Sequence, residues 1–408
     1  MMFATPELIA EAAQRSSLEA LLPRWRNAPL YRDTLVGAFA QFPIIGKSEL
    51  RRNFPANFLR PDQNLDAMVA EQSVELEHTS GSSEERVAVL FPRGWWNEQE
   101  ARVLRMNAEI AWVLDEFPQA RRATLVPPVC NGLVCFSNFT SKTSRTIGST
   151  LFVNQARIPF LLDEAEFARI AEEITSWSPQ FLDLDPVHGS WFALYCEQKG
   201  IRFPSVKFVL CSYEFESVVH RRILQRVFQV PIYNLYGSTE AGHLIMENEH
   251  GLTKPCLENV YLETVESGQA GIGSLVVTTL TNDIMPLVRY QTGDLAQRLD
   301  QPAGTHYIVH GRARDVLHRA DGQRITTWQA DQCFAGADGF AHYALRQRND
   351  GHCHVQFIPV GSGPDQSVLH QVTGRIRDLL QSRELVTAES VKILPPLPSG
   401  KFRLTQRV

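Results

Sequence analysis

The sequence has few cysteines, no long apolar stretch and no cluster of basic residues. Its seven cysteines are odd in number and include no C-x-x-C pair, which argues against a disulfide framework and favours a reducing, cytoplasmic location. The formal net charge of −5, without a run of Lys and Arg, argues against a nucleic-acid partner. Glu7, Glu11 and Arg15 interrupt the N-terminal apolar residues, so neither a signal peptide nor a membrane partner is expected.

The length and the hydrophobic pattern predict a multidomain α/β protein. A chain of 408 residues with 44% apolar and 21% charged residues has enough material for two or three globular domains. Segments of helical period alternate with short β-branched runs. We expect helices over 97–116, 165–177 and 217–228 and strands over 206–211 and 231–235. The last three segments make a βαβ unit with parallel strands, whose carboxyl ends are the usual place for a ligand.

The pattern changes beyond Gly311. About a hundred residues remain, with strands expected near 342–346, 353–359 and 390–394 and a helix over 367–383. This composition predicts a small α+β domain attached to a large one. We place the large domain at residues 1–312 and the small one at 313–408.

Two segments of small and hydroxyl-bearing residues could bind phosphate. Residues 78–83 (HTSGSS) could wrap a polyphosphate with backbone N–H and hydroxyl groups, but such runs are also common as surface turns. Residues 236–240 (YGSTE) follow a strand. The Tyr236 ring could stack on a purine and the Glu240 carboxylate could bind Mg²⁺. The alternative is a turn with a solvated carboxylate.

Three further motifs are polar and lie in expected turns. Residues 289–295 (RYQTGDL) place Asp294 where a carboxylate could accept both ribose hydroxyls, or simply in an ordinary turn. Residues 311–315 (GRARD) could form a hinge or a plain linker. Residues 398–401 (PSGK) carry Lys401, and a lone exposed lysine is usually only a solubilising charge.

The order and spacing of these motifs resemble the adenylate-forming superfamily of acyl-CoA synthetases, peptide-synthetase adenylation domains and luciferases. Within it, the chain is most similar to the phenylacetate–CoA ligase branch. Residues 27–32 (NAPLYR), 43–51 (PIIGKSELR) and 278–289 (TTLTNDIMPLVR) carry that closer resemblance. The similarity covers essentially the whole chain.

The resemblance implies an α/β fold with parallel-sheet subdomains in the large N-terminal domain and a small, mobile C-terminal domain. It implies an AMP-forming acid–thiol ligase that uses ATP and Mg²⁺. The enzyme would convert a carboxylic acid, of an aromatic kind, into an acyl-adenylate. The acyl group would then pass to the thiol of coenzyme A or of the phosphopantetheine on an acyl carrier protein.

The resemblance also assigns roles by position. The nucleotide would contact Thr79, Ser80, Gly81, Ser82, Ser83, Ser212, Tyr213, Glu214, Tyr236, Gly237, Ser238, Asp294 and Arg312. Thr239 would contact the α-phosphate, Glu240 would place Mg²⁺, and Lys401 would act from the small domain. Arg314 would be the hinge. The acid pocket would include Asn131, Phe136, Asp185, Tyr213, Gly237 and Leu244, of which Phe136 and Tyr213 suit a flat aromatic acid.

Glu84, Arg86 and Arg314 depart from the family pattern, and the first two leave one alternative open. Relatives often have Asp or Lys at the hinge position, which is Arg314 here. The phosphate loop has Glu84 and Arg86 where relatives have Gly and Pro, and a glutamate beside a triphosphate is repulsive unless it turns away. The chain could therefore be a non-catalytic relative that serves as a binding subunit. A second alternative is adenylation followed by transfer to an amine. His243, His250 and Cys256 have no fourth zinc ligand at a standard spacing, which favours ordinary core or surface roles.

Overall fold

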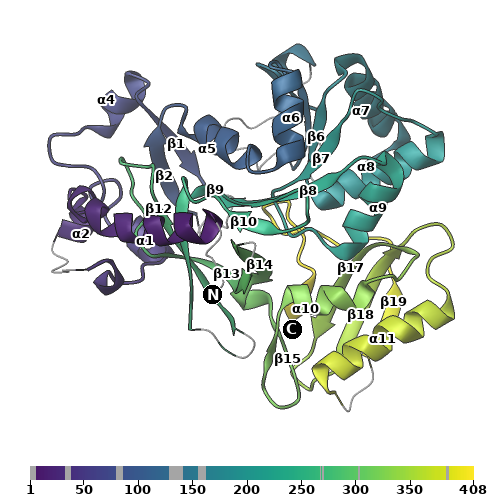
Figure 1. Cartoon of the computed structure of the whole chain (residues 1–408). Coiled ribbons are helices and arrows are strands. Elements are labelled where there is room, and N and C mark those ends of the chain that lie inside the picture. Colours follow the sequence, from purple (N-terminus) through teal and green to yellow (C-terminus); the bar gives the residue numbers. More distant parts are fainter. Residues whose placement is uncertain are drawn as a thin grey trace. The chain divides into compact units, whose positions relative to one another are not determined.

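The computed structural model describes residues 6–32, 38–79, 86–127, 141–154, 162–266, 268, 271–301, 304–382 and 386–408 (Figure 1). The chain divides into two compact units. The first unit is Met1–Ala111 with Leu235–Val309, and the second is Trp112–Asn234 with His310–Val408. The chain passes between them inside α6 (Ala108–Glu116), β8 (Ile232–Ser238) and β14 (Gly304–Arg312).

The second unit contains a parallel sheet with helices between its strands. The strands are β3 (Arg122–Leu125), β5 (Thr150–Phe152), β6 (Phe181–Leu184), β7 (Phe208–Cys211) and the first residues of β8, with β4 (Thr146–Ile147) antiparallel at the edge. The helices are α7 (Glu164–Trp177), α8 (Pro186–Lys199) and α9 (Val218–Phe228), and a short 3₁₀ turn η3 spans Thr143–Arg145. The parallel βαβ unit predicted over 206–235 is confirmed.

Local capping explains where these helices begin. The side chains of Asp163, Asp185 and Ser217 each accept a hydrogen bond from a backbone amide in the first turn of α7, α8 and α9, respectively. Such a cap satisfies an amide that has no partner inside the helix and stabilises it by about 1 kcal/mol. Pro186 follows Asp185 at the first helical position, where the missing N–H costs nothing.

The C-terminal part of the second unit is a four-stranded sheet covered by one long helix. The strand order is β19 (Val386–Ser390), β18 (Cys353–Pro359), β17 (Phe340–Gln347) and β20 (Thr405–Arg407). Helix α11 (Gln366–Leu380) lies beside this sheet (Figure 1). Its buried residues Val372, Ile376 and Leu380 belong to the same hydrophobic core as residues of β17 and β18. A small hairpin, β15 (Leu317–His318) and β16 (Arg324–Ile325), precedes α10 (Thr327–Asp331) and the 3₁₀ turn η7 (Gln332–Phe334). The strand predicted at 390–394 is wrong, because β19 ends at Ser390.

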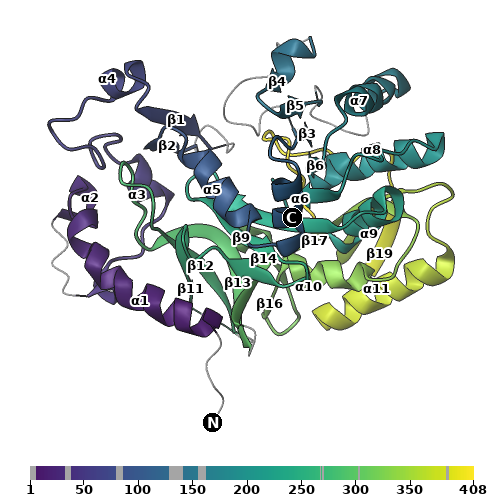
Figure 2. The same ribbon diagram turned by 45° about the horizontal axis from the view of Figure 1, so that its top comes forward.

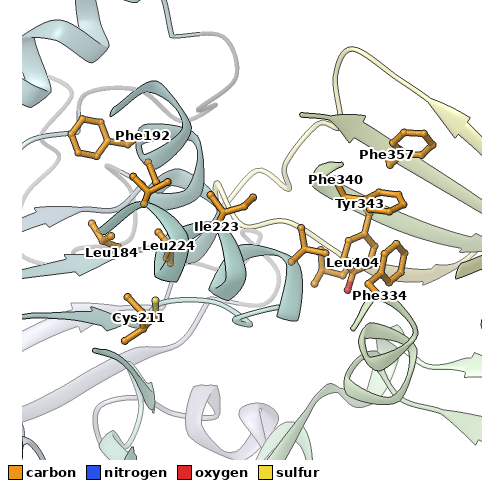
Figure 3. Close-up of a cluster of buried hydrophobic side chains, with 14 of the residues drawn as sticks. Leu184, Phe192, Cys211, Ile223, Leu224, Phe334, Phe340, Tyr343, Phe357 and Leu404 are labelled. Carbon is orange, nitrogen blue, oxygen red and sulfur yellow. The ribbon is translucent and has the colours of Figure 1, made fainter. Parts of the chain in front are cut away.

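One hydrophobic core joins the parallel sheet to the C-terminal sheet within the second unit. Figure 3 shows side chains from β6, α8, β7 and α9 together with side chains from η7, β17, β18 and the segment before β20. Phe334 and Tyr343 stack with ring centroids 3.8 Å apart. Burying each large apolar side chain contributes about 1.5–3 kcal/mol, so this core stabilises the observed packing of the C-terminal part against α8 and α9.

The first unit consists of antiparallel sheets. The hairpin of β1 (Val74–His78) and β2 (Ala88–Pro92) forms a sheet of its own. The end of β8 pairs with β9 (Gly242–Glu247), and β9 pairs with β10 (Thr253–Pro255). A third sheet has the order β11 (Val260–Val265), β12 (Ile272–Thr279), β13 (Tyr290–Gln301) and β14. Helix α1 (Pro6–Trp25) lies along this sheet (Figure 2), and the Gln14 side chain donates to the carbonyl oxygens of Leu257 and Val260.

The remaining helices of the first unit are short, and one prediction fails there. They are α2 (Pro29–Arg32), η1 (Phe39–Gln41), α3 (Lys47–Arg51), α4 (Leu65–Ala70) and α5 (Trp95–Leu104). The helix predicted over 97–116 is wrong as a single element, because α5 ends at Leu104 and α6 starts at Ala108. Asn107 causes the break: its Oδ1 accepts from the Ile110 amide at 3.0 Å, and its Nδ2 donates to the Glu247 carbonyl at 3.0 Å.

In the part of the chain that the structure describes, no helix combines the length and apolar character needed to span a membrane.

Two clusters of candidate active-site residues

A widened bulge in β13 positions Asp294 in the first unit. Ser274 of β12 pairs with Leu295 of β13, and Val276 pairs with Gln291. Between these two pairs β13 therefore has two residues more than β12, and they do not pair. Gly293 takes a φ of +85° there, a conformation that favours glycine. Thr292 Oγ1 accepts from the Asp294 amide at 3.1 Å and donates to the Leu275 carbonyl at 3.2 Å. The two hydrogen bonds of the Thr292 hydroxyl group therefore stabilise the bulge.

Tyr236 and Asp294, which the sequence motifs predicted for adenine and ribose, are in direct contact. The Tyr236 hydroxyl donates to Asp294 Oδ2 at 2.7 Å. The ring is half-buried at the end of β8, while Asp294 is 7% exposed. An aromatic face beside an acceptor carboxylate is an arrangement that suits a nucleoside.

The turn after Tyr236 requires glycine at two positions. A Cβ on Gly237 would lie 2.6 Å from the Gly242 carbonyl oxygen, and one on Gly242 would lie 2.7 Å from the Trp95 ring. The first clash is with backbone, which cannot move aside without breaking the β8–β9 pairing. Ser238 then closes the turn, because its Oγ accepts from the Ala241 amide at 3.2 Å. Leu244, predicted for the acid pocket, is fully buried in the core of the first unit.

Glu240 is a buried carboxylate held through one of its oxygens. It is 8% exposed, and its Oε1 lies 3.3 Å from Lys47 Nζ and accepts from the Tyr290 hydroxyl at 3.1 Å. Thr239 beside it is half-buried. Among the described residues, no three His, Cys, Asp or Glu side chains form a metal-binding group. A single carboxylate nevertheless fits Mg²⁺, which keeps water and takes its other ligands from substrate phosphates.

Most of the predicted phosphate loop and part of the predicted acid pocket lie outside the described residues. These are Ser80, Gly81, Ser82 and Ser83, together with Glu84, Asn131 and Phe136. Thr79 is described and buried: its amide donates to the Val87 carbonyl at 3.0 Å, and its Oγ1 accepts from the Val87 amide at 3.0 Å. Thr79 thus joins the two ends of the loop. Arg86, just before Val87, is exposed.

In the second unit, Asp183 holds the segment that follows β7. Its Oδ1 accepts from Ser212 Oγ at 2.8 Å, and its Oδ2 accepts from the Tyr213 hydroxyl at 3.3 Å. Arg122 Nη1 lies 3.7 Å from the same carboxylate. Tyr213 has a φ of +74°, which is uncommon for a residue other than glycine and is found at binding sites.

Lys401 contacts this same segment. Its ammonium group donates to the Tyr213 carbonyl, and the amide of the next residue, Phe402, donates to Glu214 Oε2 at 2.7 Å. Two of the residues that the resemblance assigned to the nucleotide after β7, Tyr213 and Glu214, therefore contact the segment that carries Lys401, the residue it assigned to catalysis.

Arg312 and Arg314, the predicted nucleotide brace and hinge, are exposed at the start of the C-terminal part. Arg312 caps the 3₁₀ turn η6 (Ala313–Asp315), in which Arg314 lies. Gly311 has a φ of +89°, and a Cβ there would lie 2.9 Å from Thr327. Asp315 pairs with Arg403 at 3.0 Å. This ion pair connects the 311–315 segment to the residues just before β20.

Sequence reasoning missed four residues that support the two clusters. Lys47 and Tyr290 hold Glu240, and Arg122 and Asp183 hold the 212–213 segment. Lys47 and Tyr290 lie inside the quoted stretches 43–51 and 289–295, so their place in a motif was a usable signal. Arg122 and Asp183 lie in ordinary strands, and nothing in the local pattern distinguishes them.

Two buried histidines stack between α9 and β17. His220 Nε2 and His342 Nδ1 are 3.0 Å apart, and Ser217 Oγ is 2.9 Å from His220 Nδ1. Burial lowers the pKa of His220 from 6.5 to about 4. Burial, with His220 and His188 nearby, holds the pKa of His342 well below its ordinary value. One ring nitrogen must donate and the other accept, so at least the accepting ring is neutral, and the lowered pKa values keep both rings neutral near pH 7.

These histidines should make the protein less stable in acid. Each folded-state pKa is lowered, so the stabilisation is complete above pH 6.5 and is lost as the pH falls from 6.5 towards about 4. Each histidine then costs about 1.4 kcal/mol per pH unit. We expect His342→Gln to be destabilising at neutral pH but to weaken the acid-side slope in urea unfolding. The matched control His250→Gln, at a side chain 75% exposed, should leave the slope unchanged; an equal slope in all three proteins would contradict the prediction.

The fold is that of the adenylate-forming enzymes, with a large sheet that contains parallel strands and a smaller C-terminal sheet. The chain is similar to a 2-hydroxyisobutyryl-CoA ligase in the postadenylation state in complex with R3-HIB-AMP: the TM-score is 0.70 and the identity 15%, over 100% of this chain and 90% of that one. It is also similar to an anthranilate-CoA ligase in complex with anthranoyl-AMP (TM-score 0.58, 14% identity, 80% and 65% covered). A benzoate-CoA ligase from Burkholderia xenovorans LB400 gives a TM-score of 0.53 at 14% identity, with 81% and 68% covered.

No protein-family model matches the sequence, and no curated protein matches it. At these identities the structural likeness shows the fold. The predicted fold class is confirmed by it.

Proposed function

We propose that the chain is an AMP-forming acid–thiol ligase that activates a carboxylic acid with ATP and passes the acyl group to a thiol. The observation that carries the proposal is the convergence of motifs distant in sequence: Tyr236 meets Asp294 in the first unit, and Lys401 meets Tyr213 and Glu214 in the second. The fold supports it, since three similar structures are CoA ligases and two of them were solved with acyl-AMP compounds.

In this proposal, the cluster of the first unit binds the nucleotide. The Tyr236 ring stacks on adenine, and Asp294 accepts from the ribose hydroxyls. Thr239 contacts the α-phosphate, and Thr79 fixes the base of the phosphate loop. Glu240 would hold Mg²⁺ through its second oxygen, because Lys47 and Tyr290 already occupy the first. The metal would supply charge neutralisation at the phosphates.

The cluster of the second unit contributes the cation for the first half-reaction. A carboxylate that attacks the α-phosphorus of ATP meets two negative groups, so the barrier is largely electrostatic. The Lys401 ammonium would offset the charge that develops on the transferring group. Little proton transfer is required, and correct positioning supplies much of the remaining acceleration.

The finer assignments belong to the same proposal. Residues 313–408 form a small domain that turns about Arg314 between the two half-reactions, so that Lys401 leaves before the thiol arrives. The acid is aromatic, the acceptor is coenzyme A or a carrier-protein thiol, and the chain works in the cytoplasm. The phenylacetate–CoA ligase branch is favoured by the stretches 27–32, 43–51 and 278–289.

The decisive experiment is exchange of labelled pyrophosphate into ATP over a panel of carboxylic acids. We expect acid-dependent and Mg²⁺-dependent exchange with at least one aromatic acid, because adenylate formation is reversible. A second stage supplies the active acid with coenzyme A, a carrier protein or an amine, and identifies the acceptor by mass spectrometry. No exchange with any acid, from a protein that melts cooperatively and binds no ATP, would favour the non-catalytic alternative.

A further inference from the structure

The segment after β7, residues 212–214, forms two hydrogen bonds with the turn that carries Lys401. The Lys401 side chain donates to the Tyr213 carbonyl, and the Phe402 amide donates to Glu214 Oε2. The second bond matters more for placement, because it holds the backbone next to Lys401 rather than the end of a flexible side chain. Glu214 itself lies on a short connection, with its amide bonded to the Ser212 carbonyl at 2.9 Å.

Asp185 stands behind Glu214 at the start of α8. Its Oδ1 accepts three hydrogen bonds, from the Val187 amide at 3.0 Å, the His188 amide at 2.9 Å and His188 Nδ1 at 3.0 Å. Asp185 is fully buried. A carboxylate with three donors on one oxygen is strongly held as the anion.

Each carboxyl group of this pair has one oxygen without a donor among the described residues. Asp185 Oδ2 and Glu214 Oε1 are both buried, and no amide, ammonium or hydroxyl group of the described residues donates to either. The two carboxyl groups lie close enough to interact with one another. Two ionised carboxylates cannot share such a contact in a buried place, so one proton must lie between them.

The proton resides on Glu214. Burial, with the neighbouring Asp185 carboxylate, raises the pKa of Glu214 well above its ordinary value. Burial alone would also raise the pKa of Asp185, but His188 and its amide hold that pKa below its ordinary value. We infer that Glu214 donates this proton to Asp185, while its Oε2 accepts from the Phe402 amide.

We propose that Asp185 and Glu214 are positioning residues for Lys401: a carboxyl pair that shares one proton and clamps the Phe402 backbone. Through this clamp, the first turn of helix α8 determines the position of the turn that carries Lys401. The proposal rests on the proposed function for the role of Lys401, while the clamp itself is independent of that role.

The groups around the pair make its charge state specific. Lys401 faces Glu214 from the C-terminal turn, and His188 faces Asp185 from α8. His220 on α9 interacts electrostatically with the Asp185 carboxylate, and His342 on β17 interacts electrostatically with His188. The Phe402 ring packs between them, with centroids 4.9 Å from His342 and 6.3 Å from His188.

Glu214→Gln and Glu214→Met separate the clamp from simple packing. A glutamine amide donates to Asp185 and accepts from Phe402 as the protonated glutamate does, whereas methionine fills the space without either bond. We expect single-turnover adenylate formation at neutral pH to be about tenfold or more slower in Glu214→Met than in Glu214→Gln, the usual scale for a lost supporting contact.

The pH profile gives a second and sharper readout. In the wild type, adenylate formation should fall as rising pH removes the shared proton, whereas Glu214→Gln has no such proton and should lack this decline. Any loss that comes from Lys401 is common to both proteins and cancels in the comparison. The control Glu216→Gln alters a nearby glutamate bound to Arg221 at 2.9 Å, and it should keep the wild-type pH profile.

Amide hydrogen exchange of the C-terminal peptide tests the clamp without any activity. Exchange at Phe402 should rise in Glu214→Met and stay at the wild-type level in Glu214→Gln and Glu216→Gln. Unchanged exchange in Glu214→Met, or an alkaline decline in Glu214→Gln equal to that of the wild type, would overturn the clamp. Raised exchange in Glu214→Met, with no acid adenylated by any variant, would support the clamp and count against the proposed function instead.

Discussion

Lys401→Ala should slow adenylate formation by about 10²–10³-fold, because removing one fixed positive group from a developing anion costs roughly 3–4 kcal/mol. Lys401 is held against the Tyr213 carbonyl by its ammonium group and beside Glu214 by the backbone of Phe402. The charge is therefore presented on a fixed segment, and water cannot substitute for it at the same place. The measurement is a single-turnover assay with ATP and the acid found by the exchange screen.

The second half-reaction supplies the internal control for Lys401→Ala. Transfer of the acyl group from pre-made acyl-adenylate to the thiol should continue near the wild-type rate, since Lys401 leaves before the thiol arrives in the proposed mechanism. Lys392→Ala removes an exposed lysine from the same C-terminal segment and should leave both steps unchanged. Equal losses in both half-reactions would show that the role assigned to Lys401 is wrong.

The secondary structure was predictable where its causes are local. The helices expected at 165–177 and 217–228 are observed at 164–177 and 218–228, because Asp163 and Ser217 are caps that can be recognised from the sequence. The helix expected at 97–116 failed for a nonlocal reason. Asn107 bonds to the Glu247 carbonyl, and no periodicity near residue 107 reports a partner 140 positions away.

The strand expected at 390–394 failed in the same way. Its apolar residues suggested a strand, yet β19 is the less apolar run Val386–Ser390, which pairs in parallel with β18. Ile393 is 49% exposed. Register in a sheet is fixed by the neighbouring strand, and that neighbour could not be identified from the segment alone.

For the candidate site, the motifs supplied residue types, and the fold supplied their proximity. Tyr236 and Asp294 are 58 positions apart, and Lys401 and Tyr213 are 188 apart. The resemblance indicated that these residues act together, but it assigned Asp185 to the acid pocket and Glu214 to the adenine pocket. It did not indicate that the two carboxyl groups touch, because a shared proton depends on burial and on the direction of two side chains. Those roles remain predictions beside the clamp proposed above.

Glu240→Gln should reduce adenylate formation by about 10²–10³-fold at ordinary Mg²⁺ concentrations and should raise the Mg²⁺ requirement, since a metal ion at transferring phosphates is worth several kcal/mol. The glutamine keeps the size of the side chain and the Tyr290 hydrogen bond but loses the negative charge. Lys47→Met is the informative comparison: it breaks the same ion pair, 3.3 Å long, yet leaves the Glu240 charge in place, so it should not raise the Mg²⁺ requirement. Glu247→Gln, at a glutamate that is also 8% exposed, controls for loss of a buried carboxylate in the same unit. If Glu240→Gln and Lys47→Met raise the Mg²⁺ requirement alike, Glu240 acts through its ion pair with Lys47, and the metal must be held elsewhere.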